Sequence, residues 1–434
     1  MGRSRSDVRS AGLYSDEEPP PLSKFVPMRL STTLVAVVGA VVLAAAAPPA
    51  VAQIPNPTAP GATEPNLSVA PNGDVYMSWL EPAPDSAFAL KVAAFNGRAW
   101  SPARTVRTGR DFFINWADFP SVQVLNGNRL AVHWLQRAGK GTYAYHVKIA
   151  FSNDAGVTWT PGVTAHTDTS ASEHGFVAMW REGDRLGAAW LDGRKFAKTD
   201  TPGHGDHNPA NEMMVASTTF DARGRRGAEV VLDGRVCDCC QNSAAVTAKG
   251  PIVAYRDRSP DEIRDIHVVR RVNGRWLEGQ PVHRDNWKIA ACPVNGPNVA
   301  AEGERVVVAW FTAANDSARV KVAFSRNSGE SFGAPVRVDN GAPAGRVDTE
   351  QLRDGSALVS WIERVGGDTA AVRVRRVWPN GRTGAPVTIA RSSAARASGF
   401  PRMAVSGDHV LFAWTVPGRP SAIRLARRPV SDFK

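Results

Sequence analysis

From residue 53 onward, hydrophobic and polar positions alternate in short runs, and Gly, Asn or Asp separates one run from the next. Strict alternation over a few residues is typical of half-buried β-strands. No sustained helical periodicity interrupts this part of the sequence. The pattern predicts an all-β protein.

One strand pair recurs seven times, at intervals of 51–65 residues. Each copy has an alternating run, a turn that contains Gly, and an apolar strand that ends in an aromatic residue. These aromatic residues are Trp79, Trp134, Trp190, Tyr255, Trp310, Trp361 and Trp414. A third alternating strand follows each copy, and usually a short fourth one. The repeat predicts a single β-propeller of four-stranded blades, seven by count or six if one copy is an insertion. We expect the aromatic residues to fill the wedges between blades.

The seventh copy stops after its third strand. We expect a segment near residues 54–64 to supply the missing outer strand, because a closed ring has no exposed strand edges. The propeller domain is therefore predicted to span residues 53–434.

Residues 1–52 differ in character from the rest of the chain. Residues 34–47 are apolar, Lys24 and Arg29 precede them, and Ala50-Val51-Ala52 follows. This order predicts a cleavable signal peptide, with Met28 as the more natural start. A retained anchor is the alternative, although a spanning helix needs about 20 apolar residues. We expect export to the periplasm or the medium, with no membrane span after cleavage.

The charge balance bears on the kind of partner. The chain has 52 Lys and Arg against 41 Asp and Glu, a formal net charge of +11. The basic residues are dispersed and form no run of the kind that binds nucleic acid. A glycan or another anionic small ligand fits this pattern, and we expect a monomer without a nucleic-acid partner.

Two turn sequences carry a resemblance to a known family. Between the third and fourth strands of the second copy stands SNDAGVTW, residues 152–159, and the fifth copy has the weaker SRNSGESF, residues 325–332. SNDAGVTW resembles the Asp box of the sialidase (neuraminidase) superfamily, in which Asp accepts backbone N–H bonds and Gly takes a positive φ. The whole mature chain is similar to exported bacterial BNR/Asp-box propellers. Within these it is closest to a group with three segments, here RVCDCCQ (235–241), YRDRS…EIRDI (255–266) and ACPVNGP (291–297).

The resemblance implies exo-α-sialidase-type chemistry on terminal acidic sugars. Family members use a tyrosine nucleophile, a glutamate base, an aspartate acid and three arginines that bind the substrate carboxylate. Residues that begin a first strand or end a second strand share one face of a propeller. By this topology Tyr255 or Tyr145 would be the nucleophile, Glu173 the base and Asp118 the acid. The arginines would be Arg194, Arg258, Arg346 and Arg402.

The sequence departs from the family pattern in two respects. The Arg-Ile-Pro motif of the first family arginine is absent, and seven repeats differ from the six blades of sialidases. The alternative is that the same Arg and Asp side chains pair across blades and tie the loops together without catalysis.

All four cysteines precede the first strands of two neighbouring units: Cys237, Cys239 and Cys240 the fourth, and Cys292 the fifth. Topology makes them neighbours. In an exported protein an even count indicates disulfides, one of them joining Cys292 to the fourth unit. The alternatives are a thiolate Cu or Zn site and a catalytic cysteine. Apart from such a site we expect no cofactor and no metal.

Two histidines, His204 and His207, lie in a polar insertion at residues 195–211. The insertion is either a solvated loop or a lid, and its histidines, or His174, would complete a thiolate metal site. Three functions follow from the sequence: a sialidase-like glycoside hydrolase, a non-catalytic propeller that binds a glycan or protein partner, and a cysteine-centred metal-binding protein.

Overall fold

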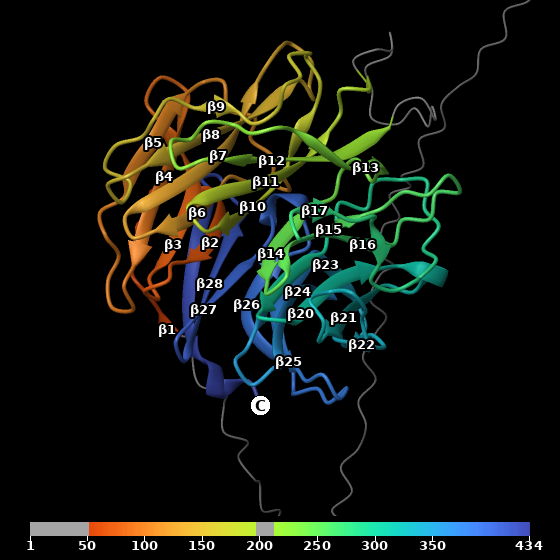
Figure 1. Cartoon of the computed structure of the whole chain (residues 1–434). Helices are drawn as coiled ribbons and strands as arrows, with labels where there is room; N and C mark the ends of the chain where they lie inside the picture. Colours follow the sequence, from red (N-terminus) through yellow and green to blue (C-terminus); the bar gives the residue numbers. More distant parts are fainter. Residues whose placement is uncertain (1–51, 197–211) are drawn as a thin grey trace, which may run out of the picture. The chain divides into compact units, whose positions relative to one another are not determined.

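The computed structural model describes residues 52–196 and 212–434. The predicted signal peptide and the histidines at 204 and 207 lie outside these residues. Within them, no helix is long and apolar enough to cross a membrane. The described chain is a seven-bladed β-propeller of antiparallel, four-stranded sheets (Figure 1). The predicted count of seven is confirmed, and the alternative of six is wrong.

Six blades are built from consecutive strands, and in blade 4 two short strands share the outermost position. Blade 1 contains β2 (Thr63–Val69), β3 (Val75–Ala83), β4 (Ala87–Phe95) and β5 (Arg104–Gly109). Blade 2 contains β6 (Ser121–Asn126), β7 (Arg129–Arg137), β8 (Tyr145–Ser152) and β9 (Val163–Thr164). Blade 3 contains β10 (His174–Glu182), β11 (Arg185–Asp192), β12 (Met213–Phe220) and β13 (Val230–Val236). Blade 4 contains β14 (Ser243–Thr247), β15 (Gly250–Arg256), β16 (Ile266–Val272), β17 (Arg275–Trp276) and β18 (Gln280–Pro281).

The remaining blades follow the same order, except that the last one borrows a strand from the start of the chain. Blade 5 contains β19 (Asn298–Glu302), β20 (Arg305–Thr312), β21 (Arg319–Ser325) and β22 (Val336–Arg337). Blade 6 contains β23 (Pro343–Gln351), β24 (Ala357–Gly366), β25 (Thr369–Val377) and β26 (Val387–Ser393). Blade 7 contains β27 (Arg402–Ser406), β28 (His409–Val416), β29 (Ala422–Pro429) and β1 (Ala52–Gln53). Short 3₁₀ helices are η2 (Ala314–Asp316), η3 (Arg396–Ser398) and η4 (Val430–Asp432).

Strand β1 closes the ring. Ala52 pairs with Arg427 and Gln53 with Ala426, both in β29. We expected the segment 54–64 to supply the outer strand of blade 7. The two residues directly before that segment supply it instead, so the expectation is corrected by two residues. Blade 7 gains its fourth strand in this way, so its third strand has no open edge along the paired residues.

The seven repeated aromatic residues all lie on second strands and are 5% exposed or less, as the sequence predicts. Several of them need a hydrogen-bond partner for a buried N–H or O–H. Trp79 donates its indole N–H to Glu81 at 2.7 Å, and Trp310 donates to Asp285 at 2.7 Å. Trp79 and Trp310 therefore bury an apolar ring and direct its one polar group, the indole N–H, at a carboxylate.

Both predicted third-to-fourth-strand turns have the expected hydrogen bonds. In the first, Asp154 accepts the Thr158 backbone N–H at 2.9 Å, and Gly156 takes φ 87°. In the second, Asn327 stands where the first turn has aspartate and accepts the Ser331 N–H at 3.0 Å. These turns join the two outer strands of blades 2 and 5. They are features of the fold and do not carry chemistry.

Candidate active site between blades 2 and 3

Tyr145 and Glu173 form the closest acid–base pair among the predicted site residues. Tyr145 begins β8, Glu173 directly precedes β10, and their backbones form a parallel bridge. The Tyr145 hydroxyl donates a hydrogen bond of 2.6 Å to Glu173 Oε1. The structure thus brings together Tyr145 and Glu173, which the topology placed on one face.

Asp118 lies beside this pair. Its Oδ1 accepts the Phe176 backbone N–H at 2.8 Å. A Cβ added at Gly175 would overlap Asp118 Oδ2 and lie 2.9 Å from Tyr145 Cε2. Glycine is thus required where the two side chains converge. The structure brings together the predicted acid, the predicted base and one of the two predicted nucleophiles.

The local electrostatics hold the protons of Asp118 and Tyr145 more tightly than usual. Burial and the charge of Glu173 raise the pKa of Asp118 well above its usual value, although the Phe176 N–H opposes the shift. Burial and the charges of Glu173 and Asp118 likewise raise the pKa of Tyr145. A carboxyl with a raised pKa keeps its proton near neutral pH and can act as a general acid.

Glu64 is a fourth member of the cluster that the sequence did not indicate. It lies in β2 with a positive φ of 57° at a register shift between Thr63 and Asn66. Burial and the charge of Asp118 raise its pKa. A break in strand alternation near residue 64 was the available signal, because an irregular strand turns a polar side chain inward.

Residues Asn115–Phe119, here called the central segment, connect blade 1 to blade 2 and touch several other blades. Gln241, ahead of blade 4, donates to the Ala117 carbonyl at 2.6 Å. Phe400, ahead of blade 7, stacks on Trp116 with ring centroids 5.9 Å apart. Asp118 is part of this segment, so its position depends on contacts from distant parts of the ring.

The four predicted arginines are all engaged within the protein and do not converge on one point. Arg194 pairs with Asp192 and Glu229, Arg258 with Glu262, and Arg402 with Asp348. Arg346 differs, since its hydrogen bonds in the described chain go to three carbonyl groups of residues 394–399 and to the Ser398 hydroxyl. Its guanidinium lies 4.8 Å from the Trp116 ring centroid. Arg346 is therefore the one of the four without a carboxylate among these contacts.

Tyr255 occupies the wedge of blade 4 rather than the Tyr145–Glu173 cluster. It is fully buried, and its hydroxyl donates to Asp233 at 2.7 Å. Burial and the charge of Asp233 raise its pKa. The structure pairs this tyrosine with an aspartate of β13 and not with Glu173 or Asp118.

The four cysteines are neighbours, as predicted, but the expected disulfides are not formed in the described chain, where all four are free thiols. Cys237 Sγ lies 3.8 Å from Cys239 Sγ and 3.6 Å from Cys240 Sγ, whereas a disulfide needs about 2.05 Å. Cys292 contacts Cys239. Burial raises the pKa of Cys237 to about 12. At Cys240 burial is outweighed by the other two thiols and Arg256, which hold its pKa below its usual value.

A second cluster, of three histidines, was missed by the sequence reasoning. Ligand atoms of His146, His166 and His174 lie within 4.8 Å of one another. Of the three, only His174 is predicted from the sequence to bind a metal, together with the cysteines. The signal that could have found this cluster is the place of the residues on their strands. His146 is the second residue of β8, and His174 is the first residue of β10.

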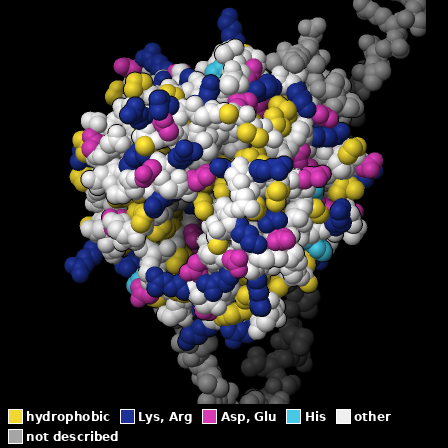
Figure 2. All heavy atoms as spheres, viewed as in Figure 1, with side chains coloured by type: hydrophobic (Ala, Val, Ile, Leu, Met, Phe, Trp, Pro, Cys, Tyr) yellow, Lys and Arg dark blue, Asp and Glu magenta, His cyan; other side chains and the backbone are white. Residues whose placement is uncertain are grey.

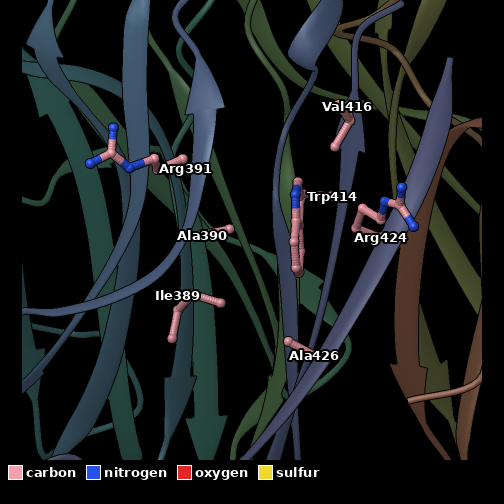
Figure 3. A pocket seen from close by; sticks show the side chains of 7 residues that line it. All are labelled: Ile389, Ala390, Arg391, Trp414, Val416, Arg424 and Ala426. Atoms are coloured by element: carbon pink, nitrogen blue, oxygen red, sulfur yellow. The ribbon is translucent and has the colours of Figure 1, made fainter. Parts of the chain in front are cut away.

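A cavity of about 400 Å³ lies away from these clusters, between β26 of blade 6 and β28 and β29 of blade 7. Figure 3 shows the Trp414 indole edge-on between the side chains of Arg391 and Arg424. The cavity contains no acid, histidine or cysteine among its lining residues, so it offers no acid–base chemistry. Figure 2 shows Lys and Arg interspersed with Asp and Glu over the viewed face, in line with the dispersed charge of the sequence.

Fold and site define a seven-bladed propeller with a buried Tyr–Glu–Asp cluster between two blades. No family model matches the chain, and no curated protein matches it either. Similar solved structures include a protein of unknown function from Dyadobacter fermentans, with 14% identity over 85% of this chain and 94% of that one and a TM-score of 0.46. An ulvan lyase of polysaccharide lyase family PL25 has 14% identity over 73% and 79%, TM-score 0.44. A Trypanosoma rangeli sialidase in complex with sialic acid has 12% identity over 85% and 60%, TM-score 0.46. With TM-scores below 0.5, these likenesses support no conclusion about the chemistry of this chain.

Proposed function

We propose that this protein is an exported hydrolase that removes terminal acidic sugars from glycans, with Tyr145, Glu173 and Asp118 as its reacting residues. The observation that carries the proposal is the 2.6 Å hydrogen bond from the Tyr145 phenol to Glu173. Asp118 supplies the protonated carboxyl that such a pair requires. A tyrosine nucleophile is the sialidase variant of glycoside hydrolysis.

The reaction has two balanced steps. In the first, the Tyr145 oxygen bonds to the anomeric carbon while its proton passes to Glu173. The bond to the leaving oxygen breaks, and Asp118 gives that oxygen its proton. In the second step, water attacks the glycosyl–tyrosine bond and loses a proton to Asp118, and Glu173 returns its proton to the phenolate. All three residues regain their initial states.

Arg346 is the residue we assign to the substrate carboxylate. It is buried and has hydrogen bonds to neutral oxygens only, as described above. A buried guanidinium without a counter-charge favours an anionic ligand, which it grips through two parallel N–H bonds. Burial and the neighbouring charges of Arg364 and Arg396 lower the pKa of Arg346 to about 10, so it remains charged at neutral pH.

Substrate access requires movement of the central segment. Tyr145, Asp118 and Glu173 are each 6% exposed or less. Phe113 stacks on Tyr145 with ring centroids 3.9 Å apart, and Asp118 itself belongs to the central segment. A sugar therefore reaches Tyr145 only after Phe113 and the central segment have shifted, and turnover is expected to be limited by this step.

The test is hydrolysis of fluorogenic glycosides, sialosides included, by the mature chain and two matched variants. Tyr145→Phe is expected to abolish turnover. Tyr255→Phe, which removes another buried and hydrogen-bonded phenol, is expected to retain it. Circular dichroism of both variants monitors folding. Inactivity of the wild type on every glycoside, or equal activity of the two variants, contradicts the proposal.

The cysteine distances favour a second candidate, a thiolate metal site for Zn²⁺ or Cu⁺. Tetrahedral coordination with Zn–S bonds of about 2.3 Å places sulfurs about 3.8 Å apart. The measured separations of 3.6 and 3.8 Å fit this spacing, and Cys292 supplies a fourth sulfur beside Cys239. Metal analysis combined with denaturing thiol alkylation decides the matter. Stoichiometric metal with four alkylatable thiols supports the site, and a mass four hydrogens below the reduced value shows two disulfides instead.

A further inference from the structure

We propose that His146, His166, His174 and Asp168 form a structural Zn²⁺ site between blades 2 and 3. His146 lies on β8, His166 follows β9, and His174 begins β10. The three candidate nitrogens lie within 4.8 Å of one another. The inference does not depend on the proposed hydrolase activity or on the cysteines.

Among the described residues, three buried ring nitrogens form no hydrogen bond: His146 Nδ1, His166 Nε2 and His174 Nε2. The last of them faces the carboxylates of Asp168 at 3.2 Å and Asp192 at 3.7 Å. His166 is 2% exposed and His174 is fully buried. A buried polar atom without a partner costs free energy that natural folds rarely leave uncompensated. A cation bound by all three nitrogens compensates the three atoms at once.

The other ring nitrogen of two histidines is held by the backbone. His166 Nδ1 contacts the Asp168 carbonyl at 2.8 Å, and His174 Nδ1 contacts the Ser172 carbonyl at 3.2 Å. Such contacts place the proton on Nδ1 and leave the Nε2 lone pair for a metal. Zinc-binding histidines usually donate their other ring N–H to a carbonyl or carboxylate oxygen in this way.

We assign Asp168 as the fourth ligand, because its carboxylate faces one nitrogen of the cluster. Its Oδ2 lies 3.2 Å from His174 Nε2, and the hydroxyl groups of Ser170 and Ser172 donate to the same carboxylate oxygen. Three imidazoles and one carboxylate complete a four-coordinate shell with no position left for substrate. Imidazole-rich sites suit Zn²⁺, and a closed shell indicates a structural role.

Zinc binding changes the local packing in a defined way. The His166 and His174 rings are stacked, with centroids 3.6 Å apart and an interplanar angle of 7°. Two parallel rings cannot both aim a nitrogen at one ion, so binding splays the stack and draws the three nitrogens closer together. His146 follows Tyr145 and His174 follows Glu173, so the ion would fix the two strands that carry this pair.

The experiment uses the exported chain with Cys237→Ser and Cys240→Ser, which removes two of the clustered thiols. After chelator treatment, Zn²⁺ is titrated by calorimetry and bound metal is counted by mass spectrometry. We expect one equivalent per chain and a melting temperature that rises with free Zn²⁺. Adding His146→Gln, a half-buried position with little folding risk, is expected to weaken binding at least tenfold.

His267→Gln, which lies outside the cluster, is the matched control and should retain full affinity. With Co²⁺ as the probe, the site should give visible absorption without thiolate-to-cobalt charge-transfer bands, because its ligands are nitrogen and oxygen. Absence of bound metal in the Cys237→Ser/Cys240→Ser protein overturns the inference. Equal affinity of the His146→Gln and His267→Gln variants also overturns it. Neither result bears on glycoside hydrolysis, which is tested separately by Tyr145→Phe.

Discussion

The Trp190 indole donates its N–H to Asp192 across 2.9 Å, and both residues lie on β11. Residues two positions apart on a strand share one face, so the acid is placed next to the indole by the strand itself. The same tryptophan–acid spacing recurs at Trp79–Glu81 and Trp361–Glu363, each with the same hydrogen bond. In three blades, a carboxylate near the end of the second strand therefore accepts a hydrogen bond from the buried tryptophan of that strand.

Trp190→Phe should destabilise the protein more than Trp134→Phe. Both changes remove the same buried atoms, but the Trp134 N–H has no hydrogen-bond partner to lose. Trp190→Phe breaks a bond to a charged acceptor, and the difference in free energy of unfolding is expected to be about 1.5–3 kcal/mol. Urea denaturation of both variants measures it. Equal midpoints would mean that the indole–carboxylate bond contributes nothing net.

Asp118→Asn should lower turnover by about 10²–10⁴-fold for substrates with poor leaving groups, because the general acid is lost. Aryl glycosides with acidic phenols need no protonation and should be much less affected. The raised pKa of Asp118 also predicts that activity falls on the alkaline side, as the carboxyl loses its proton. Loss of activity independent of the leaving group would assign Asp118 a structural role only.

Arg346→Lys should raise KM for sialosides at least tenfold with less effect on neutral glycosides, because an ammonium cannot replace a two-pronged guanidinium. Arg402→Lys should have a smaller effect, since Arg402 already pairs with Asp348 at 3.3 Å. Steady-state kinetics on a matched acidic and neutral substrate separate the two. Proportional losses on both substrates would remove Arg346 from carboxylate recognition.

Asp257→Asn should stabilise the protein at high pH but not at low pH. Burial and the charge of Asp233 raise the pKa of Asp257 to about 7, against about 3.9 in an unfolded chain. Between these values the folded state holds a proton that the unfolded chain releases, so stability falls as pH rises through this window. The variant should therefore gain up to about 4 kcal/mol at pH 8 and almost nothing near pH 4. Chemical denaturation at both pH values is the measurement, with the exposed Asp261→Asn as control. A gain independent of pH would contradict the assignment.

The ring of blades was predictable because a propeller repeats one hydrophobic pattern. Trp79 and Trp414 are 335 residues apart, yet each lies on an apolar second strand and occupies the same kind of wedge. The same regularity bears on the choice between the two predicted nucleophiles, Tyr255 and Tyr145. Tyr255 is the fourth copy of the wedge aromatic, and its repeat position already indicated a core residue. Tyr145 stands outside that repeat, which is where a functional tyrosine is expected.

The histidine cluster and the inward position of Glu64 could not be predicted from the sequence pattern, for a different reason. His146 and His166 come from the outer half of blade 2 and His174 from the innermost strand of blade 3. Their approach depends on how far neighbouring blades rotate against each other, which no local pattern encodes. Glu64 turns inward only because β2 slips in register by Asn66.

The pairing of Ala52–Gln53 with β29 joins the first described residues to nearly the last. Blades 1 to 6 each consist of consecutive residues, so each can assemble as soon as its own stretch of chain is available. Blade 7 has to wait for both ends. Until then the third strand of blade 7 offers its free backbone groups to any passing strand, including the same strand of another copy. Pairing of these two residues therefore closes the ring. Before this pairing forms, the chain is most prone to associate with other copies through the open strand edge of blade 7.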